Sequence, residues 1–351
     1  MALNEWAWVA SDLASMSPFP PWIKHGLWLV PLLGGFTILG FAWQASRLLV
    51  SPKRRPLQDY HQIILKDPAA HGMRLRSFAT THPDKTLTPC LICEPTSTPS
   101  LKGQRVRDQL AQRDVRLPRT GTVIGTLVLA HGHSGRKEDH LPVAERLCAA
   151  GFRCLLFDVP GHGDHPKPFT TFGLTEARLP KAVLDGAAAC FDFSPTQACL
   201  FGVSEGGAII LQAAAHNPEA WLAVGELSSF ATLSQVIRHE ARRFGPFANL
   251  TAVVMQQMVK HRANYDPSQI RPIDAVAVLQ TMPVLIGHGD ADRFVTPNNA
   301  HELFAACPSP RKQFLSIPGA SHGRVFVTEA PVYATLCQFF LEAMEATPVR
   351  R

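Results

Sequence analysis

Ser204 lies in a Gly-x-Ser-x-Gly motif over residues 202–206, a pattern that can carry nucleophilic chemistry. An apolar run over 198–201 precedes the motif and a helical pattern of small residues over 208–215 follows it, which predicts a strand, a sharp turn and a helix. The flanking glycines remove side-chain clashes at such a turn and leave the hydroxyl exposed. We expect Ser204 to be a nucleophile. The motif alone occurs by chance in roughly one chain in ten of this length, so partners are needed.

A serine hydroxyl needs a base that takes its proton, and the base needs a carboxylate that fixes its tautomer. The sequence offers both at the ends of later strand patterns. Asp290 and Asp292 follow the apolar run at 284–286, and His322 follows the run at 313–317. Loops that follow parallel strands meet at one edge of the sheet, so these side chains are expected to converge on Ser204. From this pattern, either aspartate could turn inward.

The elements that must position these residues alternate along the chain. β-rich runs are predicted at 73–78, 88–93, 122–130, 153–157, 198–203, 221–224, 284–286 and 313–317. Helical patterns are predicted at 57–65, 105–113, 141–150, 179–191, 207–216, 298–306 and 332–346. Such alternation predicts an α/β fold, with a mostly parallel sheet covered by helices on both faces. The segment 227–279 is also helical and lies where a lid would follow the sixth strand.

Five loops at successive strand ends resemble those of the α/β-hydrolase superfamily, and the resemblance runs from Met73 to the carboxyl end. The matching motifs are His131-Gly132, Asp158-x-x-Gly161-His162-Gly163, Gly202-x-Ser204-x-Gly206, Gly289-x-x-Asp292 and His322-Gly323. Within the superfamily the sequence is most similar to the esterase, dienelactone-hydrolase and serine-aminopeptidase-like branches. The resemblance implies that a domain over 73–351 has this fold, with a small helical lid at 227–279.

The resemblance also implies a role for each site residue. Ser204 is the expected nucleophile, His322 the general base and acid, and Asp292 the orienting carboxylate. The backbone N–H groups of His133 and Glu205 are the expected oxyanion hole. No metal ion and no organic cofactor are implied.

A metal site is the alternative reading of one group of residues. The candidate ligands are Asp158, His162 and Asp164, with His131 and His133 nearby in the sequence. The loop that holds Asp158 to Asp164 recurs in the α/β-hydrolase fold as a structural turn, and we therefore favour a structural role.

The amino-terminal part of the chain predicts a membrane anchor. Residues 1–25 form a segment rich in tryptophan, and residues 26–46 contain no Asp, Glu, Lys or Arg. As a helix, 26–46 would extend about 31 Å, close to the thickness of a bilayer core. We expect an uncleaved transmembrane helix over 26–46. A cleaved signal peptide and a peripheral or buried apolar helix are the alternatives.

Charge and cysteine usage predict where the large domain lies. Arg47, Lys53, Arg54 and Arg55 follow the apolar run, whereas Lys24 precedes it, so the positive-inside rule places the domain in the cytoplasm after a linker over 47–72. Eight cysteines without the spacing of a disulfide scaffold fit a reducing compartment. The net charge of +6 comes from scattered residues, which argues against a nucleic-acid partner.

These observations predict a serine hydrolase that cleaves carboxylic esters through an acyl-enzyme intermediate. A membrane location suggests hydrophobic or lipid-derived esters as the small-molecule substrate. A thioesterase, peptidase or acyltransferase could use the same three residues. A non-catalytic ligand-binding protein that keeps the fold is the alternative from another class.

Overall fold

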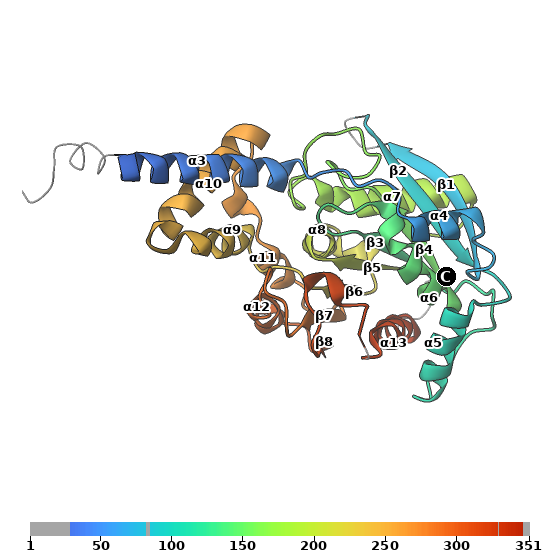
Figure 1. Cartoon of the computed structure of the whole chain (residues 1–351). Helices are drawn as coiled ribbons and strands as arrows, with labels where there is room; N and C mark the ends of the chain where they lie inside the picture. Colours follow the sequence, from blue (N-terminus) through green and yellow to red (C-terminus); the bar gives the residue numbers. More distant parts are fainter. Residues whose placement is uncertain (1–28, 82–84, 329, 347–351) are drawn as a thin grey trace, which may run out of the picture.

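The computed structural model describes residues 29–81, 85–328 and 330–346, and its centre is an eight-stranded sheet (Figure 1). The strand order is β1-β2-β4-β3-β5-β6-β7-β8. The strands are β1 (Met73–Thr81), β2 (Leu87–Pro95), β3 (Gly125–Ala130), β4 (Phe152–Phe157), β5 (Ala198–Val203), β6 (Val224–Leu227), β7 (Val284–Gly289) and β8 (Lys312–Ile317). β2 runs antiparallel to β1 and β4, and β3 to β8 pair in parallel. The predicted mostly parallel sheet is confirmed.

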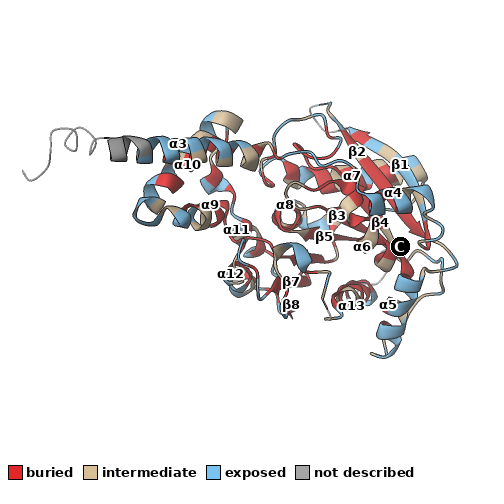
Figure 2. Cartoon of the chain, in the orientation of Figure 1, coloured by how far each residue is buried: buried red, intermediate tan, exposed pale blue. Residues whose placement is uncertain are grey.

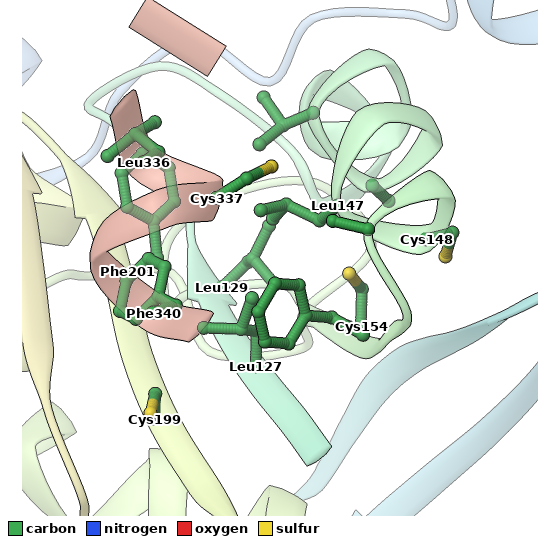
Figure 3. Packing of buried hydrophobic residues seen from close by; sticks show 14 of the residues in the cluster. Leu127, Leu129, Leu147, Cys148, Cys154, Cys199, Phe201, Leu336, Cys337 and Phe340 are labelled. Carbon is green, nitrogen blue, oxygen red and sulfur yellow. The ribbon is translucent and has the colours of Figure 1, made fainter. Parts of the chain in front are cut away.

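Helices cover both faces of the sheet, as predicted. One face packs against α5 (Leu101–Ala111), α6 (Leu141–Ala149) and α13 (Val332–Glu345). The other packs against α7 (Leu179–Phe191), α8 (Glu205–His216), α11 (Pro272–Val276) and α12 (Asn298–Ala306). Figure 3 shows the first of these cores, where Phe201 of β5 meets Phe340 of α13 edge to face. Because neighbouring strand residues point to opposite faces, Leu200 belongs to the second core.

The sixth strand differs from its prediction over 221–224. The strand begins at Val224 and runs to Leu227, after a 3-10 turn at Pro218–Ala220. Its pairing partner is Leu200–Val203 of β5, which brings Glu226 opposite Gly202. The apolar residues before Val224 therefore mark the approach to the strand. A buried glutamate inside a strand breaks the apolar pattern, and this is why the prediction ended too early.

The cysteines of the chain are all free thiols, and all except Cys190 are buried. Cys90 and Cys93, the CxxC pair, lie on opposite faces of β2 in the two separate cores. This arrangement agrees with buried thiols that pack as small apolar side chains.

A helical cap extends from one end of the sheet (Figure 1). It consists of α9 (Leu233–Ala241), α10 (Ala248–Ala263) and the amino-terminal helix α3 (Leu29–Val50), which lies along α10. α9 and α10 occupy the interval where the lid was expected. Arg243 stacks on Phe41, and Arg262 stacks on Trp43, so aromatic side chains of α3 are tied to the lid helices.

The predicted transmembrane helix over 26–46 is not supported by the described residues. Among the described residues, no helix is both long enough and apolar enough to cross a bilayer. Over residues 34–50, much of α3 is exposed (Figure 2). Ile38 is buried, and Ala42 and Val50 are buried in the cluster that α3 forms with α9 and α10. Residues 26–28 and the segment 1–25 lie outside the described residues. The predicted linker over 47–72 contains the last turn of α3 and helix α4 (Asp59–Lys66).

Candidate active site

Ser204 occupies a strained turn between β5 and α8. Its φ of 56° and ψ of −118° lie outside the regions that L-residues favour. A Cβ on Gly202 would come within 2.4 Å of the Gly206 carbonyl oxygen, and a Cβ on Gly206 within 1.9 Å of the Ala130 carbonyl oxygen. Only glycine fits at both positions, which explains the spacing of the motif. The turn presents the Ser204 hydroxyl at the carboxyl end of β5.

The structure brings Ser204, His322 and Asp292 together in one chain of hydrogen bonds. Ser204 Oγ lies 2.9 Å from His322 Nε2, and His322 Nδ1 lies 2.6 Å from Asp292 Oδ2. Since a carboxylate only accepts, Nδ1 carries the proton and Nε2 is left to accept from the serine hydroxyl. Asp290 is exposed and accepts instead from the backbone N–H of Gly319 at 2.7 Å. The aspartate that turns inward is therefore Asp292.

The Asp292 carboxylate is buried and held by several donors. Its Oδ1 accepts from the backbone N–H groups of Phe294 at 2.9 Å and Val295 at 3.0 Å. Burial acts to raise the pKa of Asp292, but its contacts with His288 and His322 outweigh burial and hold that pKa well below the usual range. Asp292 is consequently ionised at neutral pH and stabilises a positive charge on His322.

His288 and Glu226 extend this group, and the sequence analysis missed both. The Nε2–H of His288 donates to the Val295 carbonyl oxygen at 2.8 Å and lies 3.2 Å from Asp292 Oδ2. Glu226 accepts from the Ser229 backbone N–H at 2.8 Å, and burial raises its pKa to about 7 despite the opposing effect of His288. The sequence signal that could have identified Glu226 and His288 is a titratable residue inside an otherwise apolar strand.

The loop after β3 lies directly against the serine. A Cβ on Gly132 would come within 3.4 Å of Ser204 Cβ. Within the described residues, no hydrogen bond to another residue uses the backbone N–H of His133 or of Glu205. Glu205 is the first residue of α8, where N–H groups lack helical partners. Both groups are thus available to an oxyanion beside Ser204.

The side chains of the two expected oxyanion residues also meet. His133 Nδ1 lies 2.7 Å from Glu205 Oε2, and His133 Nε2 donates to the Leu48 carbonyl oxygen at 3.1 Å. The next loop residue, Ser134, accepts from Arg55 Nε at 2.5 Å through its carbonyl oxygen. The end of α3 and the segment after it therefore support the oxyanion loop. No sequence pattern could indicate this contact, because Leu48 contributes a backbone oxygen.

The five candidate metal ligands named in the sequence analysis do not lie together in one site. Lys137 Nζ forms ion pairs with Asp158 at 2.9 Å and Asp164 at 2.6 Å, so these carboxylates neutralise a buried lysine. His131 Nε2 accepts from the Val159 backbone N–H at 3.1 Å and fixes the loop after β4. His133 and His162 instead lie beside Glu205.

Known proteins resemble this chain in sequence and in fold. The uncharacterised protein YfhR of Escherichia coli K12 is 24% identical over 200 residues, which are 57% of this chain and 63% of YfhR. The match thus spans less than two thirds of that relative.

Two solved structures share the fold. An esterase of Pyrococcus furiosus, Pf2001, superposes with a TM-score of 0.60 at 13% identity, covering 84% of this chain and 97% of the esterase. The acylaminoacyl peptidase of Pyrococcus horikoshii superposes with a TM-score of 0.55 at 12% identity, covering 85% of this chain and 45% of the peptidase. Residues 127–335, more than half of this chain, match the sequence profile of the alpha/beta hydrolase family, and the chain therefore belongs to that family.

Proposed function

We propose that the protein is a serine hydrolase that cleaves carboxylic esters through an acyl-enzyme on Ser204. The observation that carries the proposal is the chain from Ser204 Oγ through His322 to Asp292, with separations of 2.9 and 2.6 Å. The strained turn at Ser204 supports it, because such strain persists where it presents a reacting group.

In the proposed reaction, His322 Nε2 takes the hydroxyl proton as Ser204 Oγ attacks the ester carbonyl carbon. The oxyanion accepts hydrogen bonds from the backbone N–H groups of His133 and Glu205. His322 then gives its proton to the departing alkoxide, and the acyl-enzyme remains. A water molecule deprotonated by His322 attacks the acyl carbon, and His322 returns the proton to Ser204 as the acid leaves. Asp292 keeps the tautomer of His322 correct throughout.

The surroundings of the site favour an apolar acyl group. Phe172 and Phe230 form part of the buried cluster that joins α8 to the cap, and Phe294 packs edge to face on His322 at 5.1 Å between ring centroids. We propose hydrophobic or lipid-derived esters as the substrate class. A thioesterase, a peptidase, an acyltransferase and a non-catalytic ligand-binding protein remain the alternatives that experiment must separate.

Labelling with a fluorophosphonate probe tests the enzyme class. The wild-type protein should be labelled, and the Ser204→Ala variant should not. An unlabelled, folded wild-type protein would contradict the proposal and favour a ligand-binding role. For the substrate class, kcat/KM should rise with chain length across p-nitrophenyl esters and exceed the values for matched thioesters and aminoacyl amides.

We also propose that the amino-terminal segment attaches the protein to a membrane, with the large domain in the cytoplasm. Apolar side chains on α3 support this proposal, because Phe36, Leu39 and Trp43 are 71%, 49% and 56% exposed. Reporter fusions after Arg55 should give a cytoplasmic signal, and the protein should stay in the membrane fraction after carbonate extraction. A periplasmic or luminal signal would overturn the topology.

A further inference from the structure

Three side chains beside the oxyanion loop form a cluster that the proposed reaction does not use. Glu205 comes from the start of α8, His133 from the loop after β3, and His162 from the loop after β4. One potential ligand atom of each lies within 4.8 Å of the others. Glu205 and His162 are each only 1% exposed, so water does not solvate their facing atoms.

The hydrogen bonds of His162 leave a lone pair aimed at a carboxylate. Its Nδ1 lies 3.0 Å from the Pro160 carbonyl oxygen, which only accepts, so Nδ1 carries the ring proton. Its Nε2 is buried, has no hydrogen-bond partner and lies 3.5 Å from Glu205 Oε2. This ring nitrogen therefore faces the carboxylate without a hydrogen bond to it.

His133 has the same arrangement. Its Nε2–H donates to the Leu48 carbonyl oxygen, and its Nδ1 faces the same Glu205 oxygen at 2.7 Å. At this distance Nδ1 and Oε2 form a hydrogen bond, whose proton a bound metal ion would displace. The other oxygen of Glu205 is already occupied, because it accepts from the Thr170 hydroxyl. Oε2 and the two imidazole nitrogens are consequently left for a shared positive charge.

We propose that His133, His162 and Glu205 bind a divalent transition-metal ion of the zinc class. Two imidazole nitrogens and a carboxylate oxygen form a donor set that suits Zn²⁺, with a fourth position open to water. Both histidines donate their other ring N–H to backbone carbonyls, as metal-bound histidines commonly do. A tetrahedral ion with bonds of about 2.0–2.1 Å separates its ligand atoms by about 3.4 Å. The 3.5 Å between His162 and Glu205 fits this value, and the 2.7 Å between His133 and Glu205 must widen when the ion binds.

The role of this ion is to join loops. It connects the oxyanion loop and the loop after β4 to the first turn of α8, next to the serine. It takes no part in any bond-making step. Because His133 also contacts Leu48, the ion fixes the end of α3 against the same loop. Binding should therefore raise the temperature of unfolding by mass action.

Metal titration of the full chain tests the proposal directly. Protein stripped with a chelator and dialysed is titrated with Co²⁺ and then competed with Zn²⁺. We expect one equivalent of Co²⁺ to give visible d–d bands without thiolate charge-transfer absorption, since the cluster contains no cysteine. One equivalent of Zn²⁺ should remove these bands. Binding of wild-type protein weaker than about 10 µM would overturn the proposal.

Matched variants assign the ligands. His162→Gln and Glu205→Gln should each weaken Zn²⁺ binding by more than about 100-fold, since loss of even an outer partner of a ligand costs about 10- to 100-fold. His140→Gln is the matched control, because His140 is a buried histidine outside the cluster. Cys190→Ser tests the exposed thiol. Unchanged affinity in both ligand variants, or loss of binding with Cys190→Ser, would refute the site.

Discussion

Two carboxylates near Ser204 are each flanked by a pair of histidines. Asp292 lies 2.6 Å from His322 and 3.2 Å from His288. Glu205 lies 2.7 Å from His133 and 3.5 Å from His162. The side-chain types and separations are similar in the two groups. The groups differ in what is faced by the outer nitrogen of a histidine, that is, the ring nitrogen that points away from the carboxylate.

The outer nitrogen decides what each group can do. His322 directs its Nε2 at the Ser204 hydroxyl, which can give up a proton. His133 and His162 direct their outer nitrogens at the carbonyl oxygens of Leu48 and Pro160, which have no proton to give. The first group can therefore move a proton, whereas the second can only hold a charge in place. The following predictions test this distinction.

The largest effect is expected from Asp292→Asn. An amide in this position donates to His322 Nδ1 and forces the wrong tautomer, so kcat should fall about 10⁴-fold. Steady-state kinetics on an ester substrate measure this fall in kcat. Asp290→Asn is the matched control, and an equal loss in that variant would contradict the assignment of the inward-facing acid.

Glu226→Gln tests the buried acid that borders only the Asp292 group. Because burial raises the pKa of Glu226 to about 7 from its ordinary value of 4.5, the folded protein binds more protons than the unfolded chain between these values. Stability is thus lost as pH rises through this window. The variant should be more stable than wild type at pH 8 by up to about 3 kcal/mol, and equal near pH 4.

Urea unfolding at several pH values measures the difference between wild type and Glu226→Gln. The exposed Glu219→Gln variant should leave the pH dependence unchanged. A constant difference between wild type and Glu226→Gln at all pH values would show that Glu226 does not titrate in this window.

Thr170→Val removes a donor from the Glu205 group while keeping the side-chain shape. Glu205 has its pKa held at about 2, because its contacts with His162, His133 and Thr170 outweigh the opposite effect of burial. Loss of a hydrogen bond to this charged group should cost about 2 kcal/mol of unfolding free energy. The exposed Thr196→Val variant should stay within about 0.5 kcal/mol. Equal costs for the two would mean that the Glu205 carboxylate does not depend on Thr170.

The smallest effect is expected from His288→Gln. His288 positions Asp292 without contacting the reacting atoms, so kcat/KM should fall about 10-fold. Without the partial positive charge of His288 beside it, the Asp292 carboxylate stabilises the His322 imidazolium more strongly. The acid limb of the pH–rate profile should therefore move to higher pH. A fall in rate with an unmoved acid limb would assign His288 a purely structural role.

The sequence was sufficient for the sheet and for the residues that follow its strands. Ser204, His322 and an aspartate at 290 or 292 could be predicted because glycine-rich loops after apolar runs must converge at one edge of a parallel sheet. The preference for Asp292 came from the resemblance to the α/β-hydrolase superfamily. Glu226 and His288 were missed because they lie inside strands, where an apolar pattern hides them. The contact between Leu48 and His133 uses a backbone oxygen, so no residue type could indicate it.

The cap was the least predictable region. The apolar residues of α3 were interpreted as lipid-facing because a membrane helix and a buried helix share a composition. In the structure Ala42 packs in the cap and Arg262 stacks on Trp43, whereas Phe36 and Leu39 of the same helix stay exposed. The domain boundaries remain predictions.

The pairing of α3 with α10 has a consequence for synthesis of the chain. Helix α3 packs against α10, which begins only at Ala248. At about 5–20 residues per second, α10 follows α3 by roughly 10 to 40 s. During that time the nascent chain carries Ile38, Phe41 and Ala42 without their final neighbours. The contact between α3 and α10 can therefore form only after the chain between these two helices has been synthesised.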